Sequence, residues 1–266
     1  MLRWGSARRR TSEVLRLPLR DGNPCAACFA IRLFDAYTDR MSALNPSPST
    51  PVNAAVSFAL TDRISDLGGI DPARIRSTPA PGAATVEDLV RAASEDGRIY
   101  ELVDNTLVEK AMGWQESLLA MVLVRWLGNF LEAHNLGVIT GPDGLSRLFG
   151  DTVRGADVSF ISWSRMPDGR LPTEPVPTVV PDFVIEVLSV GNTRSEMARK
   201  RREYFQAGVR LVWMIDPRRR TVAVFTAPET VTIAEEFDHI DGGDVLPGWS
   251  VDLEKLFAEL DRRAPE

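Results

Sequence analysis

PDFVIEVLSVGNTRSEMARKRREYFQAGVRLVWMIDPRRRTVAVF, the stretch from Pro181 to Phe225, decides the fold because it predicts strand, helix, strand and strand in that order. The run 183–188 is almost wholly apolar, which is typical of a strand buried on both faces. Glu186 interrupts this run. A buried carboxylate needs a partner, which is an ion pair or backbone hydrogen bond in the ordinary case and a metal ion or a general-base role in the functional one.

A helix over about 196–206 is predicted to follow the strand that carries Glu186. On this helix Glu196, Lys200 and Tyr204 recur at steps of four and therefore share one face. One interpretation is a surface pair between Glu196 and Lys200, which would contribute about 0.2–0.5 kcal/mol. The other is a lysine that is brought back over the end of the Glu186 strand.

Two further strands are predicted over 209–215 and 221–226. A helix that links two strands of one sheet forms a right-handed crossover, which gathers strand ends and the helix start around one crevice. Upstream, apolar residues at helical spacing predict a long helix over 115–134, and a strand is predicted over 157–163. We therefore expect an α/β fold with a mixed central sheet flanked by helices.

A long connection, residues 164–180, lies between the strand at 157–163 and the strand that carries Glu186. It contains four prolines, which disfavour a helix. Loops of this length often have a function. We expect this loop to project beside the crevice.

The central pattern carries a family resemblance. PDFVIEVLS followed by E-x3-K-x3-Y-x3-GV-x3-W-x2-DP resembles the Uma2 family of the PD-(D/E)XK nuclease-like superfamily, whose members are described as restriction endonucleases. In that family an aspartate lies on an earlier strand, a glutamate on the next strand, and a lysine on the following helix. The matching positions here are Asp157 in RGADVSFIS, Glu186 in IEVLS and Lys200 in EMARKRREY.

The ends of the domain resemble the same family. YELVDNTLVEK at 100–110 and DGGDVLPGWSVDLEKLF at 241–257 extend the resemblance to about residues 85–260. The sequence departs from the pattern twice, with Ala156 where proline is expected before the aspartate and Asn105 where glycine is expected in a hairpin turn. Neither change removes a charged group, and asparagine tolerates a left-handed turn better than most residues.

The resemblance implies a Mg²⁺-dependent DNA endonuclease with a restriction endonuclease-like fold. Asp157 and Glu186 would hold Mg²⁺, with Mn²⁺ as a substitute, because this ion prefers oxygen ligands and keeps several waters. Lys200 would stabilise the transition-state phosphate or orient the attacking water. Glu101 would supply a further carboxylate. The alternative is a catalytically silent nucleic-acid-binding or regulatory module on the same fold.

Asp182 is a poorer metal partner for Glu186 than Asp157 is. Four residues separate the two on one strand, which places them about 13 Å apart at a rise of ~3.3 Å per residue. This distance is too long for one shared ion. We expect Asp182 to accept hydrogen bonds at the start of the strand.

The charge distribution bears on partners and location. The net charge of −6 opposes indiscriminate binding to nucleic acid, yet residues 194–220 hold nine Lys and Arg against three acidic residues. Such a basic stripe beside the carboxylates would steer DNA there. The sequence shows no apolar run of the ~18–20 residues that a membrane span needs. We expect a cytoplasmic protein without a membrane partner, and a homodimer is compatible with the sequence.

The first 80 residues differ from the rest in composition. They begin with an arginine cluster at 8–10 and pass through a Pro- and Ser-rich stretch at 46–51 without strong hydrophobic periodicity. We therefore expect a flexible extension at 1–80 and a restriction endonuclease-like domain at 81–262. Charge and proline interrupt the run after the arginines, so no signal peptide is predicted, and Met41 is a second candidate for the translation start.

Two cysteines, Cys25 and Cys28, form an isolated CAAC motif. A zinc site needs a second pair of ligands, and the only histidines, His134 and His239, lie far away in the sequence without ligand spacing. We expect reduced cysteines that bind no metal.

Overall fold

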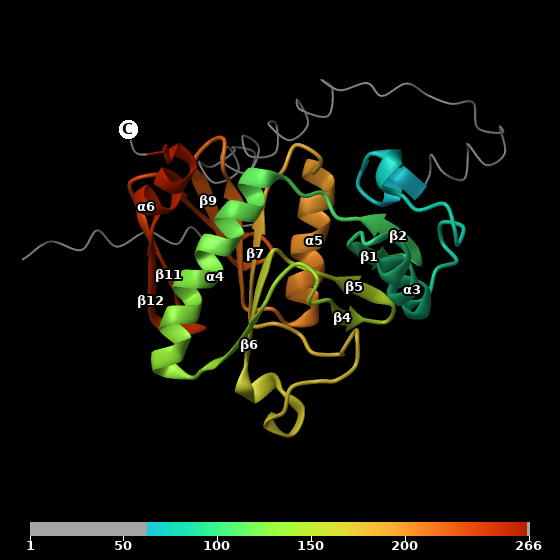
Figure 1. Cartoon of the computed structure of the whole chain (residues 1–266), viewed down its shortest axis with the longest axis horizontal. Coiled ribbons are helices and arrows are strands. Elements are labelled where there is room, and N and C mark those ends of the chain that lie inside the picture. The colour runs from blue at the N-terminus through green and yellow to red at the C-terminus, as the bar shows by residue number, and fades with distance from the viewer. Residues whose placement is uncertain (1–62, 265–266) are drawn as a thin grey trace, which may run out of the picture.

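The computed structural model describes residues 63–264. Most of the predicted extension at 1–80 lies outside these residues, as do both cysteines of the CAAC motif. The described part is an α/β fold with a mixed central sheet flanked by helices, as expected, and it has in addition a small second sheet that was not predicted (Figure 1).

The large sheet has six strands in the order β10-β9-β8-β7-β6-β3. Their bounds are β3 Gly137–Thr140, β6 Val158–Ser162, β7 Phe183–Val187, β8 Leu211–Asp216, β9 Thr221–Ala227 and β10 Thr230–Glu235. β7 and β8 are parallel, and the other neighbours are antiparallel. The parallel pair is joined by helix α5 (Arg194–Ala207), so the crossover predicted from the central stretch is present.

Helices cover both faces of the large sheet (Figure 1). On one face Phe183, Ile185 and Val187 of β7 pack in one core with α4 (Trp114–His134) and α6 (Leu253–Ala258). On the other face Val184 packs in a second core with residues of α5. Because side chains alternate along a strand, the apolar run of β7 serves both cores, and Glu186 points to the α5 side.

A smaller four-stranded sheet lies beside the large one, with the order β2-β1-β5-β4. Its strands are β1 Tyr100–Val103, β2 Thr106–Glu109, β4 Ser146–Phe149 and β5 Thr152–Arg154, and helix α3 (Val86–Asp96) packs on it. The turn between β1 and β2 holds Asp104 and Asn105 at φ values of 48° and 54°. This is the left-handed turn that Asn105 was expected to tolerate in place of glycine.

The remaining elements are short. They are the hairpin β11 His239–Gly242 with β12 Leu246–Asp252, and the 3₁₀ turns η1 Pro72–Arg74, η2 Trp163–Arg165, η3 Pro167–Gly169 and η4 Glu259–Asp261. None of the helices between residues 63 and 264 is long and apolar enough to cross a membrane.

The loop between β6 and β7 lies differently from the expectation. It leaves β6 after Ser162 and enters β7 at Phe183, and the two strands run antiparallel. Asp157 and Glu186 lie at the opposite ends of these strands, so the loop does not start or end beside them. Asp182, at the end of the loop, accepts hydrogen bonds from the Ser162 amide (2.9 Å) and from Arg165 (3.2 Å), as predicted.

Residues 63–76, here called the N-terminal segment, pack against the start of α5. Leu67 and Ile70 are buried in this segment. Thr193 Oγ1 donates to the carbonyl of Gly68 at 2.5 Å, and Arg199 donates to the carbonyl of Asp66 at 2.8 Å. Residues 63–80 were expected in the flexible extension, but packed structure begins before the boundary that was set at residue 81.

Gly68 of the N-terminal segment lies close to the backbone of α5. Its φ is +92°, and a Cβ at this position would lie 2.5 Å from the backbone nitrogen of Glu196. Gly69 also has a positive φ of +68°, but a Cβ there would meet nothing within 4 Å. A substitution of Gly69 would therefore cause backbone strain alone, whereas a substitution of Gly68 would cause backbone strain and steric overlap.

We expect Gly68→Ala to lower the free energy of unfolding by about 1–3 kcal/mol more than Gly69→Ala does. Both substitutions carry the cost of a left-handed residue, roughly 1–2 kcal/mol, and only the first also forces backbone atoms apart. Urea denaturation followed by circular dichroism measures the difference. Equal losses for the two variants would show that the contact between the N-terminal segment and α5 does not contribute to stability.

Candidate active site

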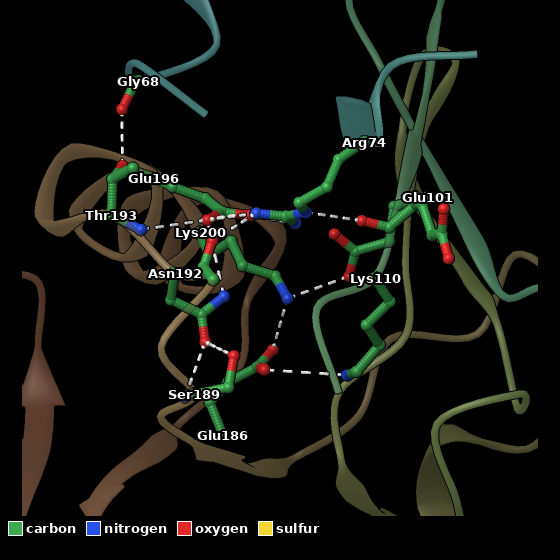
Figure 2. Close-up of polar contacts among 12 residues, drawn as sticks. Gly68, Arg74, Glu101, Lys110, Glu186, Ser189, Asn192, Thr193, Glu196 and Lys200 are labelled. Carbon is green, nitrogen blue, oxygen red and sulfur yellow. Dashed lines mark hydrogen bonds and ion pairs between the residues drawn. The ribbon is translucent and has the colours of Figure 1, made fainter. Parts of the chain in front are cut away.

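The four residues that the sequence singled out lie together between the two sheets and α5. Glu101 comes from β1, Asp157 directly precedes β6, Glu186 lies on β7, and Lys200 lies on α5. Lys200 Nζ lies 2.9 Å from Glu101 Oε1 and 2.9 Å from Glu186 Oε1. All four residues are buried. Figure 2 shows Lys200 between the carboxylates of Glu101 and Glu186.

Asp157 is positioned by strand register. β6 and β7 pair antiparallel with Val158 opposite Ile185, which places Asp157 next to Glu186 on the neighbouring strand. Asp157 Oδ2 accepts a hydrogen bond of 2.6 Å from the Val187 amide, so its carboxylate is fixed to the backbone of β7. The departure at Ala156, a buried core residue, leaves this geometry intact.

Lys200 is placed by the cap of its helix. Thr193 and Glu196 form a capping box at the start of α5, and Lys200 follows one turn later. Glu196 forms its ion pair with Arg74 of the N-terminal segment at 2.6 Å (Figure 2), and Lys200 is only 2% exposed. The interpretation of Glu196 and Lys200 as a surface pair is therefore wrong.

A second lysine, Lys110, completes the carboxylate cluster and was not singled out from the sequence. It directly follows β2 in the YELVDNTLVEK segment and is buried. Its Nζ lies 3.0 Å from Asp157 Oδ1 and 3.7 Å from Glu186 Oε2, and it also donates to the Gly155 carbonyl. Lys110 and Lys200 thus approach Glu186 from two sides (Figure 2).

A buried network of hydrogen bonds holds the carboxylates of the cluster in place. Its contacts were also not predicted from the sequence. Arg154, the last residue of β5, donates to Glu101 Oε2 at 2.7 Å and to Glu203 Oε2 at 2.6 Å. Tyr204 donates its hydroxyl to Glu186 Oε1 at 2.5 Å. Tyr204 shares the face of Lys200, so the step of four was a usable signal, whereas nothing local in the sequence pairs Arg154 with Glu203.

The comparison with known families shows to which family this chain belongs. The model of the Uma2 family, described as "Putative restriction endonuclease", matches residues 86–254, which is more than half of the chain. This chain belongs to the Uma2 family. The match includes Glu101, Asp157, Glu186 and Lys200 and begins after the N-terminal segment.

One solved structure supports the fold of this Uma2 protein. It is the crystal structure of an Anabaena variabilis protein described as "a putative nuclease belonging to DUF820". The similarity has a TM-score of 0.58 at 19% sequence identity and covers 66% of this chain and 98% of that chain. At this identity it shows the fold alone. No curated protein gives a significant match.

Charge pairing sets the protonation of the Uma2 cluster. Burial opposes ionisation of Glu186, but Lys110 and Lys200 more than offset it and hold the pKa of Glu186 below its usual value. The pKa of Glu101 is lowered in the same way, against burial, by Lys200 and Arg154. Burial raises the pKa of Asp157, and the negative charge of Glu186 raises this pKa as well. Although burial opposes its charge, Glu101 and Glu186 raise the pKa of Lys200, so it stays an ammonium.

The donor set fits a hard cation held by two carboxylates. Asp157 and Glu186 both direct an oxygen at one positive group, the ammonium of Lys110, which occupies the place of a bridging cation. Mg²⁺ is commonly held by one or two carboxylates together with waters and substrate phosphate. Within residues 63–264 no group of three or more His, Cys, Asp or Glu is arranged to hold a metal ion, so Asp157 and Glu186 would have to hold one without a third such ligand.

Solvent reaches the cluster at Asp157. A pocket of about 90 Å³ opens at the start of α4 and is lined by Met112, Glu116, Ser117, Ala120, Met121, Val124, Gly141, Pro142 and Asp157. Of the four predicted site residues, only Asp157 lines it. A small ion or a phosphate oxygen in this pocket could reach the cluster through Asp157.

Most basic residues of the predicted stripe form ion pairs with acidic residues of the same chain. Arg199 pairs with Asp104 and Glu203, and Arg220 pairs with Glu236 and Asp261. Several of these partners lie outside residues 194–220, so a count within that stretch overstates its positive charge. Lys200 and Arg201 are buried and belong to the interior of the protein.

Proposed function

We propose that this Uma2 protein is a Mg²⁺-dependent DNA endonuclease that hydrolyses phosphodiester bonds. Family membership gives the class, a nuclease acting on nucleic acid. The observation that carries the proposal is the contact of Lys200 with Glu186, whose neighbour Asp157 lies on the adjacent strand. Two carboxylates that can hold a metal ion, together with one fixed cation, are groups that can promote phosphodiester hydrolysis.

Each residue has a distinct role in the proposed reaction. A bound Mg²⁺ would acidify the attacking water and neutralise charge on the phosphate. Asp157 and Glu186 would hold it through their carboxylate oxygens. Lys200 would donate from its ammonium to the phosphate oxygen that gains charge in the transition state. Glu101 pairs with Lys200 and thereby holds this ammonium beside Glu186.

A second candidate is a non-catalytic nucleic-acid-binding or regulatory module on the same fold. The burial of the cluster favours it, since Lys200 and Glu186 are 2% and 3% exposed and are already paired with each other. In this case the ion pairs would only stabilise the fold.

Cleavage assays separate the two candidates. The full chain is incubated with supercoiled plasmid and with single-stranded DNA in the presence of Mg²⁺, Mn²⁺ or EDTA. We expect cleavage with either metal ion and none with EDTA, and Glu186→Gln purified in parallel controls for contaminating nucleases. If the parent protein cleaves no DNA under any metal condition but binds it, the second candidate is correct.

A further inference from the structure

Lys110 occupies the position between the two carboxylates that the proposed function assigns to a metal ion. Its Nζ contacts Asp157 Oδ1 at 3.0 Å and Glu186 Oε2 at 3.7 Å. Its side chain is 4% exposed, so water contributes little to its solvation. Instead of water, the two carboxylates and the Gly155 carbonyl solvate the ammonium.

A divalent ion and this ammonium cannot share the two carboxylates. Mg²⁺ binds oxygen at about 2.0–2.1 Å, so an ion bridging Asp157 and Glu186 would lie within a few ångströms of Nζ. Like charges at that distance in a buried site repel strongly. Binding of the ion therefore requires the ammonium of Lys110 to withdraw.

The two lysines differ in what would hold them after a metal ion binds. Lys200 keeps Glu101, which is not one of the proposed metal ligands, at 2.9 Å. Lys110 forms its ion pairs with Asp157 and Glu186, the two proposed ligands. A metal ion would thus leave Lys200 anchored and would take away the carboxylate partners of Lys110.

We propose that Lys110 is an internal counter-ion that competes with a divalent metal ion for Asp157 and Glu186. Without the metal ion it neutralises two adjacent buried carboxylates, and metal binding releases its ammonium from them. The inference deepens the proposed function because it concerns the same carboxylates. Its test measures metal binding, so its failure is distinct from a failure to cleave DNA.

Calorimetric titration of the full chain with Mn²⁺ at pH 8 tests the competition. We expect Lys110→Met to bind Mn²⁺ at least about tenfold more tightly than the parent, because the competing charge is gone. Lys255→Met is the matched control, since Lys255 is 76% exposed and pairs with Asp252 near the carboxyl terminus, and its affinity should equal that of the parent. The thermal midpoint of Lys110→Met should also rise more on addition of Mn²⁺.

The outcomes are separable. Unchanged or weaker Mn²⁺ binding by folded Lys110→Met would overturn the proposal and make Lys110 a structural partner only. Lys110→Gln, which can still donate to the Gly155 carbonyl, replaces Lys110→Met if that variant does not fold, and the same tightening is expected. If neither parent nor variants bind Mn²⁺, the competition is also refuted. DNA cleavage by a parent whose metal affinity is independent of Lys110 would leave the proposed function standing and refute only this inference.

Discussion

Replacement of Lys200 by methionine is expected to lower turnover in DNA cleavage by about 10²–10³-fold, the loss typical of one donor that acts in the transition state. The ammonium lies 2.9 Å from Glu186 Oε1 and would adjoin a phosphate held there. The substitution should also lower the free energy of unfolding by about 3–5 kcal/mol, because it leaves Glu101 and Glu186 buried with one cation fewer. Single-turnover cleavage and urea denaturation measure the two effects.

A variant that keeps the net charge of the cluster separates the effect of Lys200 on catalysis from its effect on folding. Lys200→Met in a Glu101→Gln protein removes one charge of each sign, so its cost in stability should fall well below that in the parent background. Its cost in turnover should remain about 10²–10³-fold relative to Glu101→Gln alone. If the neutralised background restored turnover together with stability, Lys200 would act only through the fold.

The central part of the fold could be predicted because its signals are local. The apolar run predicts a strand buried on both faces, which is β7. The strand that follows α5 in the chain then lies parallel to β7. Glu186 stood out because a carboxylate in such a run has few explanations. A position of Lys200 over Glu186 was one of two interpretations of the helix that follows a short turn after β7, and the family resemblance favoured it.

The partners of these residues could not be predicted because they come from distant segments. Glu196 has Lys200 at a favourable spacing in its own helix, yet it pairs with Arg74, which is 122 residues earlier in the chain. Lys110 enters the cluster only because the small sheet packs against α5 and β7. For the same reason the net charge of residues 194–220 was misleading, since Arg199 and Arg220 are neutralised from outside that stretch.

The second large effect is expected at Arg154, which no local pattern marks. Arg154→Met should lower the free energy of unfolding by about 3–5 kcal/mol, because Arg154 is buried between Glu101 at 2.7 Å and Glu203 at 2.6 Å. Burial opposes the charge of Arg154, but the two carboxylates raise its pKa above the usual value, so the lost group is a cation. Urea denaturation at neutral pH measures the loss.

Arg147→Met is the matched control for this prediction. Arg147 pairs with Asp151 on the surface, with side chains 38% and 50% exposed, and exposed pairs of this kind contribute less than about 1 kcal/mol. Similar losses for the two arginine variants would contradict the importance of the buried network. Arg154→Lys should recover part of the loss only, because lysine keeps the charge but lacks the planar fork that reaches both glutamates.

Acid titration gives an independent test of the same network. The pKa of Glu101 is lowered in the folded protein, so its contribution to stability is present above the pKa of the unfolded chain and is lost as the pH falls through the folded value. Arg154 is one of the groups that lower this pKa, next to Lys200. The free energy of unfolding of Arg154→Met should therefore fall less steeply than that of the parent as the pH is lowered from the pKa of an unfolded glutamate towards the folded pKa of Glu101. An unchanged slope would mean that Lys200 and Lys110 keep Glu101 ionised without Arg154.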